Sequence, residues 1–169
     1  MLSTLTGARP RVLIFGSGWI STSLYHHLRR SGWIGKVCYR HYRNPALDDE
    51  DLLRLPATQK ELVRLIDDFQ PDYMVIAGGT SFVPEIERDV AVAIDSHIGQ
   101  TLRILGAVAS CSSKPSKILT IGSVAEYGHA SVMPITEDAP IAPVDVYGLI
   151  KAAQCRSAMT FWEYFGLDV

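Results

Sequence analysis

The sequence predicts an α/β fold in which a doubly wound parallel sheet lies between two layers of helices. Two observations predict this three-layer α/β/α arrangement. Short apolar and β-branched runs alternate with segments of helical periodicity along all 169 residues. Glycine or serine residues follow three of the apolar runs, at 16–18, 78–79 and 123. Because parallel strands joined by right-handed crossovers end at one edge of a sheet, we expect these three sites to meet there.

The first half of the chain carries four strand signals and two helix signals. Arg11–Phe15 is mainly apolar and β-branched, which predicts a buried strand. Trp19–Arg30 places Ile20, Leu24 and Leu28 on one side of a helix. The other elements expected here are a strand at 36–41, a short strand near 53–56, a helix at 61–69 and a strand at 73–77.

The second half begins with a long helical pattern at 84–109. A strand at 117–121 and a helix at 146–165 follow, and 166–169 resemble the beginning of a sixth strand. We therefore expect residues 1–169 to form one domain, with a sizeable core, that ends where the sixth strand begins. The apolar side of the long helix is supplied by Val90, Val92, Ile94, Ile98, Leu102 and Leu105.

Composition disfavours several classes of protein. A net charge of −2 gives no electrostatic reason for binding nucleic acid or an anionic membrane. No apolar run approaches the roughly 20 residues of a membrane span, and residues 1–10 lack the apolar core of a signal peptide. The widely spaced Cys38, Cys111 and Cys155 disfavour a disulfide scaffold or zinc site and favour a reducing, cytoplasmic setting. Adjacent His26 and His27 diverge on a helix, so no metal site is expected.

The turn after the first strand has the spacing of a dinucleotide-binding motif. Residues 16–21 match G-x-G-x-x-G except at the last position, Ser21, and lie between a strand and a helix. Gly16 allows a tight turn, and Gly18 allows backbone amides to approach a pyrophosphate at the helix N-terminus. The alternative is a glycine turn without a ligand. The expected cofactor-binding residues in this Rossmann-type fold are Gly16, Ser17, Gly18, Trp19, Ile20, Ala77, Gly78 and Gly79.

Residues after the second strand favour NADP over NAD. An acidic residue there would accept hydrogen bonds from the adenosine ribose, but the chain has Arg40, His41 and Arg43. Guanidinium groups pair well with a 2′-phosphate, so Arg40 and Arg43 are expected to bind the cofactor. The alternative is that both arginines are merely solvated, which leaves NAD open.

Tyr147 and Lys151 form a candidate acid–base pair. Four residues apart, they lie on the same face of the expected helix, where the ammonium can hold the phenol close to its ionised form. Ser123, at a strand end, can donate a hydrogen bond to the oxygen that gains or loses the proton. An exposed Tyr/Lys pair without a function is the alternative, because this spacing alone is a weak signal.

Two long segments resemble the extended short-chain dehydrogenase/reductases, the group of nucleotide-sugar epimerases, dehydratases and reductases. Ile121–Gly128 is similar to that family's catalytic-serine segment. Residues 134–140, Pro143 and 147–154 are similar to the stretch that leads into its catalytic helix. The resemblance spans essentially the whole chain and is nearest to GDP-6-deoxymannose reductase-like enzymes. It implies that Ser123, Tyr147 and Lys151 are catalytic and that Lys151 binds the nicotinamide ribose.

Several positions depart from the family pattern. In its three-glycine register Phe15 and Ser21 replace glycines, and the acidic residue near the adenine is replaced around Leu55 or Pro56. His97 stands where the family has a structural asparagine. Sugar 4,6-dehydratases of this family use carboxylates for elimination, and at those positions this chain has Val124 and Ala125. If the preceding strand continues this far, Glu126 is expected on its opposite face. Dehydratase activity is therefore disfavoured.

The resemblance leaves three interpretations open. The first is an enzyme that uses NADP, or NAD, to reduce or 4-epimerise a nucleotide-linked sugar. The second is a non-catalytic dinucleotide-binding module, since the family's C-terminal, substrate-binding part is expected to be absent after residue 169. The third is a half-protein that assembles with a partner chain through a sheet edge. A nucleotide sugar is the expected partner, and a homodimer is left open.

Overall fold

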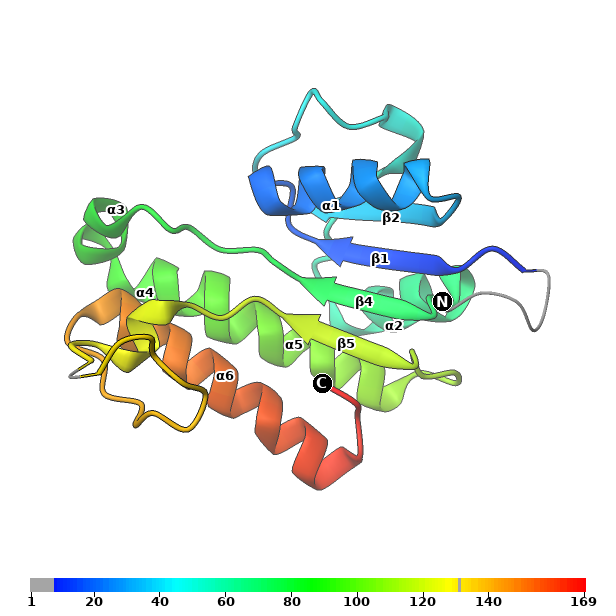
Figure 1. Cartoon of the computed structure of the whole chain (residues 1–169). Helices are drawn as coiled ribbons and strands as arrows, with labels where there is room; N and C mark the ends of the chain where they lie inside the picture. Colours follow the sequence, from blue (N-terminus) through cyan, green and yellow to red (C-terminus); the bar gives the residue numbers. More distant parts are fainter. Residues whose placement is uncertain (1–7, 131) are drawn as a thin grey trace.

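The computed structural model describes residues 8–130 and 132–169 and confirms the predicted α/β fold. Its centre is a parallel five-stranded sheet in the order β3-β2-β1-β4-β5 (Figure 1). Residues 1–7, part of the segment in which no signal peptide was expected, lie outside the described residues. The strands are β1 (Arg11–Phe15), β2 (Ile34–Tyr39), β3 (Leu52–Arg54), β4 (Tyr73–Ile76) and β5 (Lys117–Thr120).

The direction of winding reverses between β1 and β4. β1 is central, so that Phe15 lies opposite Cys38 of β2 on one side and Ile76 of β4 on the other. From β1 the chain builds outward through β2 to β3, and then returns to add β4 and β5 on the other edge. In doubly wound folds, ligands bind above the carboxyl ends of the strands at such a reversal.

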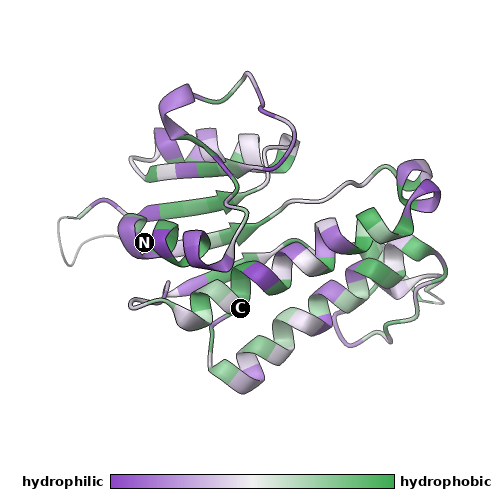
Figure 2. Ribbon diagram, turned by 180° about the vertical axis from the view of Figure 1, so that it is seen from behind, coloured by the Kyte–Doolittle hydropathy of each residue, from purple (hydrophilic) through white to green (hydrophobic). Residues whose placement is uncertain are grey.

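Helices cover both faces of the sheet and bury it completely at β1. Leu13 and Phe15 pack towards α2 (Gln59–Phe69) and α5 (Gln100–Ser110), with α6 (Val146–Phe165) beside α5 (Figure 1). Val12 and Ile14 pack on the opposite face towards α1 (Trp19–Arg30). Burial on both faces explains why the strands are continuous apolar runs, seen as predominantly hydrophobic ribbons in Figure 2.

The ends of the helices follow from local capping chemistry. α6 begins after Asp145, whose Oδ1 accepts a hydrogen bond of 2.7 Å from the Gly148 N–H, and ends at Gly166 in the left-handed conformation. α1 and α6 have the predicted bounds. α2 begins two residues earlier than expected because Thr58 and Glu61 form a reciprocal capping box.

The prediction of one continuous helix at 84–109 is wrong. The segment forms α3 (Val83–Arg88), α4 (Val90–Ile94), a π-helical turn (Asp95–Gly99) and α5. Asp89 leaves the helical conformation at φ −144°, and its Oδ1 accepts a hydrogen bond from the Val92 N–H to start α4. The break lets the chain bend as it passes from the end of β4 to the helix that covers the sheet.

β1 has the predicted bounds, the bounds of the other four strands differ from the predicted ones by one or two residues, and the start of a sixth strand expected at 166–169 is not seen in those residues. Residues 166–169 form no strand, although the Asp168 carbonyl accepts one backbone hydrogen bond of 2.7 Å from Ile118 N–H of β5. A single bond does not make a ladder. Leu167 is nevertheless buried in the core, so this segment packs beside β5.

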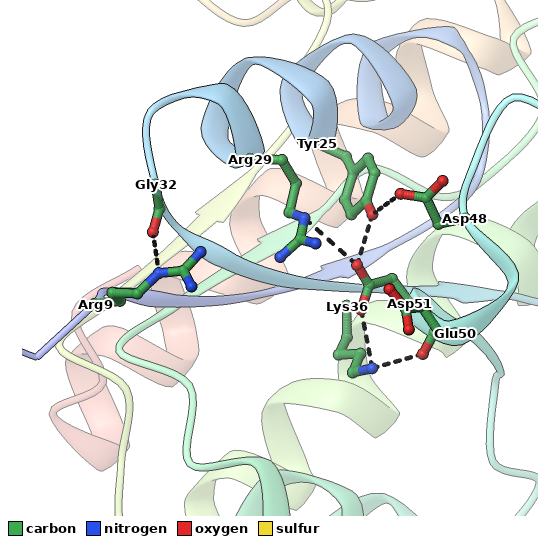
Figure 3. A network of polar contacts seen from close by, with 8 residues as sticks. All are labelled: Arg9, Tyr25, Arg29, Gly32, Lys36, Asp48, Glu50 and Asp51. Carbon is green, nitrogen blue, oxygen red and sulfur yellow. Dashed lines mark hydrogen bonds and ion pairs between the residues drawn. The ribbon is translucent and has the colours of Figure 1, made fainter.

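A buried ionic network joins α1, β2 and the loop before β3 (Figure 3). Asp51 is 6% exposed and accepts a 2.6 Å hydrogen bond from the Tyr25 hydroxyl, which also lies 3.1 Å from Asp48. Lys36 and Arg29 pair with the same carboxylate at 2.9 and 3.5 Å. Burial opposes ionisation of Asp51, but the Tyr25 hydrogen bond and the two cations outweigh it and lower its pKa.

The three cysteines are free thiols. Cys38 is buried in the sheet, and burial raises its pKa to about 12. Across residues 8–130 and 132–169, no helix has the length and apolar character needed to cross a membrane, and no three His, Cys, Asp or Glu side chains gather as a metal site would require.

Removing the Tyr25 hydroxyl is expected to destabilise the fold. Tyr25→Phe leaves the buried Asp51 without its neutral donor, and should lower the free energy of unfolding at pH 7 by about 1–3 kcal/mol in urea denaturation. Asp51 is more acidic folded than unfolded, so the stability it contributes is present above the unfolded pKa of about 4 and is lost as pH falls through the folded value. The difference between wild type and variant should therefore shrink in acid. Tyr164→Phe, at a residue 80% exposed, is the control, and equal losses in both variants would contradict the prediction.

Candidate functional site

A cleft of about 1100 Å³ lies at the carboxyl ends of β1 and β4, where the winding reverses. Its volume is slightly above the usual range for small-molecule sites, roughly 300–1,000 Å³. The three loops that the sequence expected to meet are not all in its wall: the loop at Ser123 lies outside the lining. The expected cofactor-binding residues that do line the cleft are Gly16, Ser17, Gly18, Arg40, Ala77, Gly78 and Gly79.

Gly16 brings the turn after β1 into direct contact with the backbone after β4. Its φ is +116°, and a Cβ there would lie 2.8 Å from the carbonyl of Ala77 and from the Gly78 nitrogen. The Gly16 N–H also donates a 2.8 Å hydrogen bond to the Cys38 carbonyl of β2. Gly18 differs, since a Cβ there would meet no atom within 4 Å. The first glycine is thus required by packing, and the second borders open space.

The N-terminus of α1 presents free backbone donors. Gly18 is its N-cap and supplies no side-chain cap, and the first turn has no acidic residue. Unsatisfied N–H groups and the positive end of a helix dipole suit an anion such as a pyrophosphate. Trp19 and Ile20 begin this helix but do not line the cleft; their side chains are 82% and 46% exposed.

The loop after β2 braces the glycine turn. Asn44 Nδ2 donates hydrogen bonds to the Ser17 carbonyl at 3.0 Å and to Thr22 Oγ1 at 2.9 Å. The Ser17 hydroxyl donates to the Tyr42 carbonyl. These bonds join the loop to both sides of the turn, so the position of the loop and the shape of the cleft are linked.

The two predicted arginines have different surroundings. Arg40 lines the cleft and pairs at 2.5 Å with Asp95, which lines the cleft from the π-helical turn. The hydrogen bond from Arg40 lowers the pKa of the Asp95 carboxyl. Arg43 lies outside the lining and pairs at 2.6 Å with exposed Asp49.

His97 and Gln100 lie directly beneath the glycines after β4. A Cβ on Gly79, whose φ is +118°, would come within 2.3 Å of the His97 ring, and one on Gly78 within 2.7 Å of Gln100 Nε2. His97 is 3% exposed; its Nε2 contacts the Thr80 carbonyl at 2.8 Å, while its buried Nδ1 has no partner in the described part of the chain. Burial lowers the pKa of His97, which favours a neutral ring. Its edge meets the ring of Tyr147 at a centroid distance of 6.2 Å.

Lys151 is buried beneath the end of β5. It is 4% exposed, and its Nζ donates to the Ile121 carbonyl and, at 2.5 Å, to Gln154 Oε1. Burial lowers the pKa of Lys151, and the nearby carboxylate of Glu126 acts in the opposite direction. An ammonium has three donors, so one is free for a further acceptor.

Ser123, Tyr147 and Lys151 share the place where the 3₁₀ turn η3 (Val124–Tyr127) meets α6. Ser123 is the N-cap of η3, and a Cβ on Gly148 of α6 would lie only 2.4 Å from the Ala125 carbonyl. No direct hydrogen bond joins the three side chains to one another, all of which are described. None of the three is part of the cleft lining; the buried His97 ring lies between Tyr147 and Gly79, which lines the cleft.

Glu126 was expected on a continuing strand, but in the structure it lies in the 3₁₀ turn η3. β5 ends at Thr120, and the chain turns because Ser123 and Glu126 form a capping box. Glu126 is 5% exposed, and its Oε1 accepts a 2.7 Å hydrogen bond from the Ser123 N–H.

Sequence reasoning missed several polar residues of this region. It gave no role to Asp95 and Gln100, which line the cleft, or to the buried Thr101, whose hydroxyl accepts a 2.9 Å hydrogen bond from Gln154 Nε2. The available signal was the spacing of 97, 100 and 101, which places three polar residues on one face of an otherwise apolar helical segment.

Comparison with known proteins places the chain in a family. The NAD dependent epimerase/dehydratase family matches residues 12–169, and the chain belongs to it. A UDP-glucose 4-epimerase of Azospirillum brasilense is 28% identical in an alignment 163 residues long that covers 86% of this chain and 43% of that protein. The crystal structure of UDP-glucose 4-epimerase from Brucella ovis in complex with NAD superposes with a TM-score of 0.85 at 22% identity, over 94% of this chain and 49% of that one.

The fold does not distinguish epimerases from dehydratases. DesIV, a dTDP-glucose 4,6-dehydratase from Streptomyces venezuelae, has a TM-score of 0.80 at 20% identity and covers 94% of this chain and 53% of its own. The chain spans about half the length of each relative named here. Only individual side chains can therefore indicate the reaction.

The two glycines of the turn are expected to differ in their tolerance of a methyl group. Gly16→Ala combines a positive φ with a backbone clash and should lower the free energy of unfolding by about 2 kcal/mol or more. Gly18→Ala, at φ −77° with open space around it, should cost ~1 kcal/mol or less. Urea denaturation of both variants measures the contrast, and similar midpoints would show that the close approach at Gly16 is not a constraint.

Proposed function

We propose that the chain binds a nicotinamide dinucleotide and carries the acid–base residues with which an epimerase or reductase interconverts hydroxyl and keto groups of a nucleotide-linked sugar. The observation that carries this proposal is the cleft at the β1–β4 reversal, bordered by the turn at Gly16–Gly18 and by Ala77–Gly79. Family membership and the epimerase relatives support the same class of reaction.

The cleft fits the cofactor in two respects. Gly18 leaves space at an uncapped helix N-terminus, where a pyrophosphate would accept backbone hydrogen bonds. Gly78 and Gly79 carry no side chain above Gln100 and His97, so a flat ring can lie against the backbone there. When bound, the cofactor supplies the hydride acceptor and donor.

The residues of the chain would then manage the proton. Tyr147 would take the proton of the sugar hydroxyl at its phenolic oxygen, or return it when the keto group is reduced. Lys151, whose third donor is free, would stabilise the phenolate and bind the ribose. Ser123 would donate its hydroxyl hydrogen to the sugar oxygen, since its Oγ already accepts a bond of 3.2 Å from the Ala125 N–H.

Side chains around η3 disfavour a dehydratase. Elimination of water needs an acid and a base that reach the sugar, and Val124 and Ala125 offer neither. The neighbouring carboxylate, Glu126, is buried and holds the Ser123 N–H instead. The choice therefore narrows to epimerisation or reduction.

NADP stays the favoured cofactor, with Arg40 as the arginine that would read the 2′-phosphate. Arg40 lines the cleft, whereas Arg43 does not. The relative from Brucella ovis is a complex with NAD, which keeps NAD as the alternative. The chain's own competitor for the phosphate is Asp95, which pairs with Arg40. A homodimer, a cytoplasmic setting and the alternative of a non-catalytic binding module stay predictions of the sequence.

Cofactor choice is expected to depend on the Arg40–Asp95 pair. Arg40→Ala should weaken NADPH binding about tenfold with little effect on NADH, because one charged contact to the phosphate is lost. Asp95→Asn should tighten NADPH binding several-fold by freeing the guanidinium. Fluorescence titration with both cofactors measures the ratio of the NADPH and NADH dissociation constants. The control is Arg43→Ala, which removes the same charge outside the cleft and should leave this ratio unchanged. Equal affinities for NADPH and NADH in all four proteins would contradict the role of Arg40 in binding the 2′-phosphate.

Tyr147→Phe is expected to block the proton step alone. The hydroxyl that moves the proton is lost while the ring remains against His97, so reduction of bound NAD(P) by UDP-glucose should slow by about 10²–10⁴-fold. The dissociation constant of the cofactor should change less than twofold. Absorbance at 340 nm follows the reduction. If the wild-type chain binds cofactor but shows no reduction, the non-catalytic binding module is the better interpretation.

A further inference from the structure

Glu126 is a buried carboxylic acid that contacts Ser123, one of the three proposed catalytic residues. The proposed mechanism gives Glu126 itself no role. It is 5% exposed, and its Oε1 accepts the Ser123 N–H at 2.7 Å. In the described part of the chain, no Lys, Arg or His nitrogen forms an ion pair with its carboxylate at 4 Å or less. A buried carboxylate is costly unless its charge is hydrogen-bonded or balanced, so its surroundings need an explanation.

Lys151 is a cation whose pKa this carboxylate raises. Nζ of Lys151 donates to the Ile121 carbonyl, two residues before Ser123, and η3 packs directly on the first turn of α6 at Gly148. The ammonium therefore lies under the same short turn whose N-terminal N–H is held by Glu126. Its two hydrogen-bond acceptors, the Ile121 carbonyl and Gln154 Oε1, are both neutral.

We propose that Glu126 is a positioning residue for Ser123 and Lys151: its carboxylate fixes the turn that carries Ser123 and supplies the negative charge that balances the buried Lys151 ammonium. This inference rests on the proposed function, which gives Ser123 and Lys151 their roles. A lysine that supports a phenolate must itself stay protonated, and Glu126 maintains that state in a site where burial opposes it.

The other groups that face Lys151 do not replace this charge. Cys155 on α6 is a thiol, and burial raises its pKa, which keeps it neutral. His97 on the π-helical turn has a lowered pKa, also through burial, and a cationic His97 would repel the ammonium. Tyr147 carries charge only as the phenolate that Lys151 is proposed to stabilise. Glu126 on η3 is thus the one carboxyl group among these neighbours of Lys151.

The test measures the protonation of Lys151 directly. The chain has five lysines, so the side-chain ¹³Cε and ¹⁵Nζ signals of labelled protein are few, and Lys151→Arg assigns the relevant one. Glu126→Gln keeps an oxygen acceptor for the Ser123 N–H but removes the charge. The Lys151 titration midpoint is expected to fall by about one pH unit in this variant, because an opposite charge nearby is lost.

A matched control removes the same charge elsewhere on the same helix as Lys151. Glu163 is exposed, pairs with Arg156, and lies twelve residues further along α6, about 18 Å away at 1.5 Å per residue. Glu163→Gln should leave the Lys151 midpoint unchanged. A midpoint that is equally unchanged in Glu126→Gln would overturn the proposal.

A second measurement needs no variant. In wild-type protein the Lys151 signals should respond when the Glu126 carboxyl, followed by its own side-chain ¹³C signal, becomes protonated, and the absence of any response would also overturn the inference. These readouts do not depend on turnover. If the Lys151 midpoint shifts as expected but no keto reduction is found, the proposed function fails while the link between Glu126 and Lys151 stands.

Discussion

The close approach of Gly16 to the backbone of Ala77 and Gly78 is the constraint on which the cleft depends. It holds the loop after β1 against the loop after β4 at the point where the winding reverses. No side chain fits between them, so the two loops can diverge only beyond Gly16, where Gly18 opens onto free space. The uncapped start of α1 then points into that space, and an anion site results from packing together with the orientation of a helix.

Below the cleft, the fold accepts a set of buried polar side chains that a purely structural core would avoid. Lys151, Gln154 and Thr101 form a chain of hydrogen bonds through the interface of α5 and α6, and His97 lies beside it. Each burial costs free energy unless its polar atoms find partners. The network meets that condition except at His97 Nδ1, which is left without a partner in the described residues. Buried, partly unsatisfied polar groups next to a cleft are typical of a site under functional constraint.

Much of the fold could be predicted because its central strands, β1 and β4, are largely buried on both faces and because α6 carries explicit start and stop signals. The apolar run of β1 and the Asp145 and Gly166 ends of α6 are examples. The helix at 84–109 could not be predicted, because Val92 and Ile94, counted as its apolar side, are 60% and 44% exposed. Periodicity records apolar residues but not whether a partner covers them. The glycine turn could be found from the spacing of its residues alone. The place of Asp95 and Gln100 in the cleft could not, because it depends on how the segment after β4 bends.

The fold determines the shape of the cleft, whereas single residues determine which reaction the site could support. Epimerases and a dehydratase share this sheet with similar TM-scores, so the sheet provides a cofactor cleft and little more. In the proposed function, the reaction would depend instead on the few residues between β5 and α6, where the chain leaves the strand and forms a turn. In that turn the carboxyl group points inward to the Ser123 N–H, and the outward position, Val124, is apolar and 69% exposed. An acid that points inward can orient and balance neighbouring groups, but it cannot exchange a proton with a bound sugar. The turn therefore carries no acid at Val124 or Ala125 for elimination, and it directs Glu126 inward, where we propose that it supports Lys151.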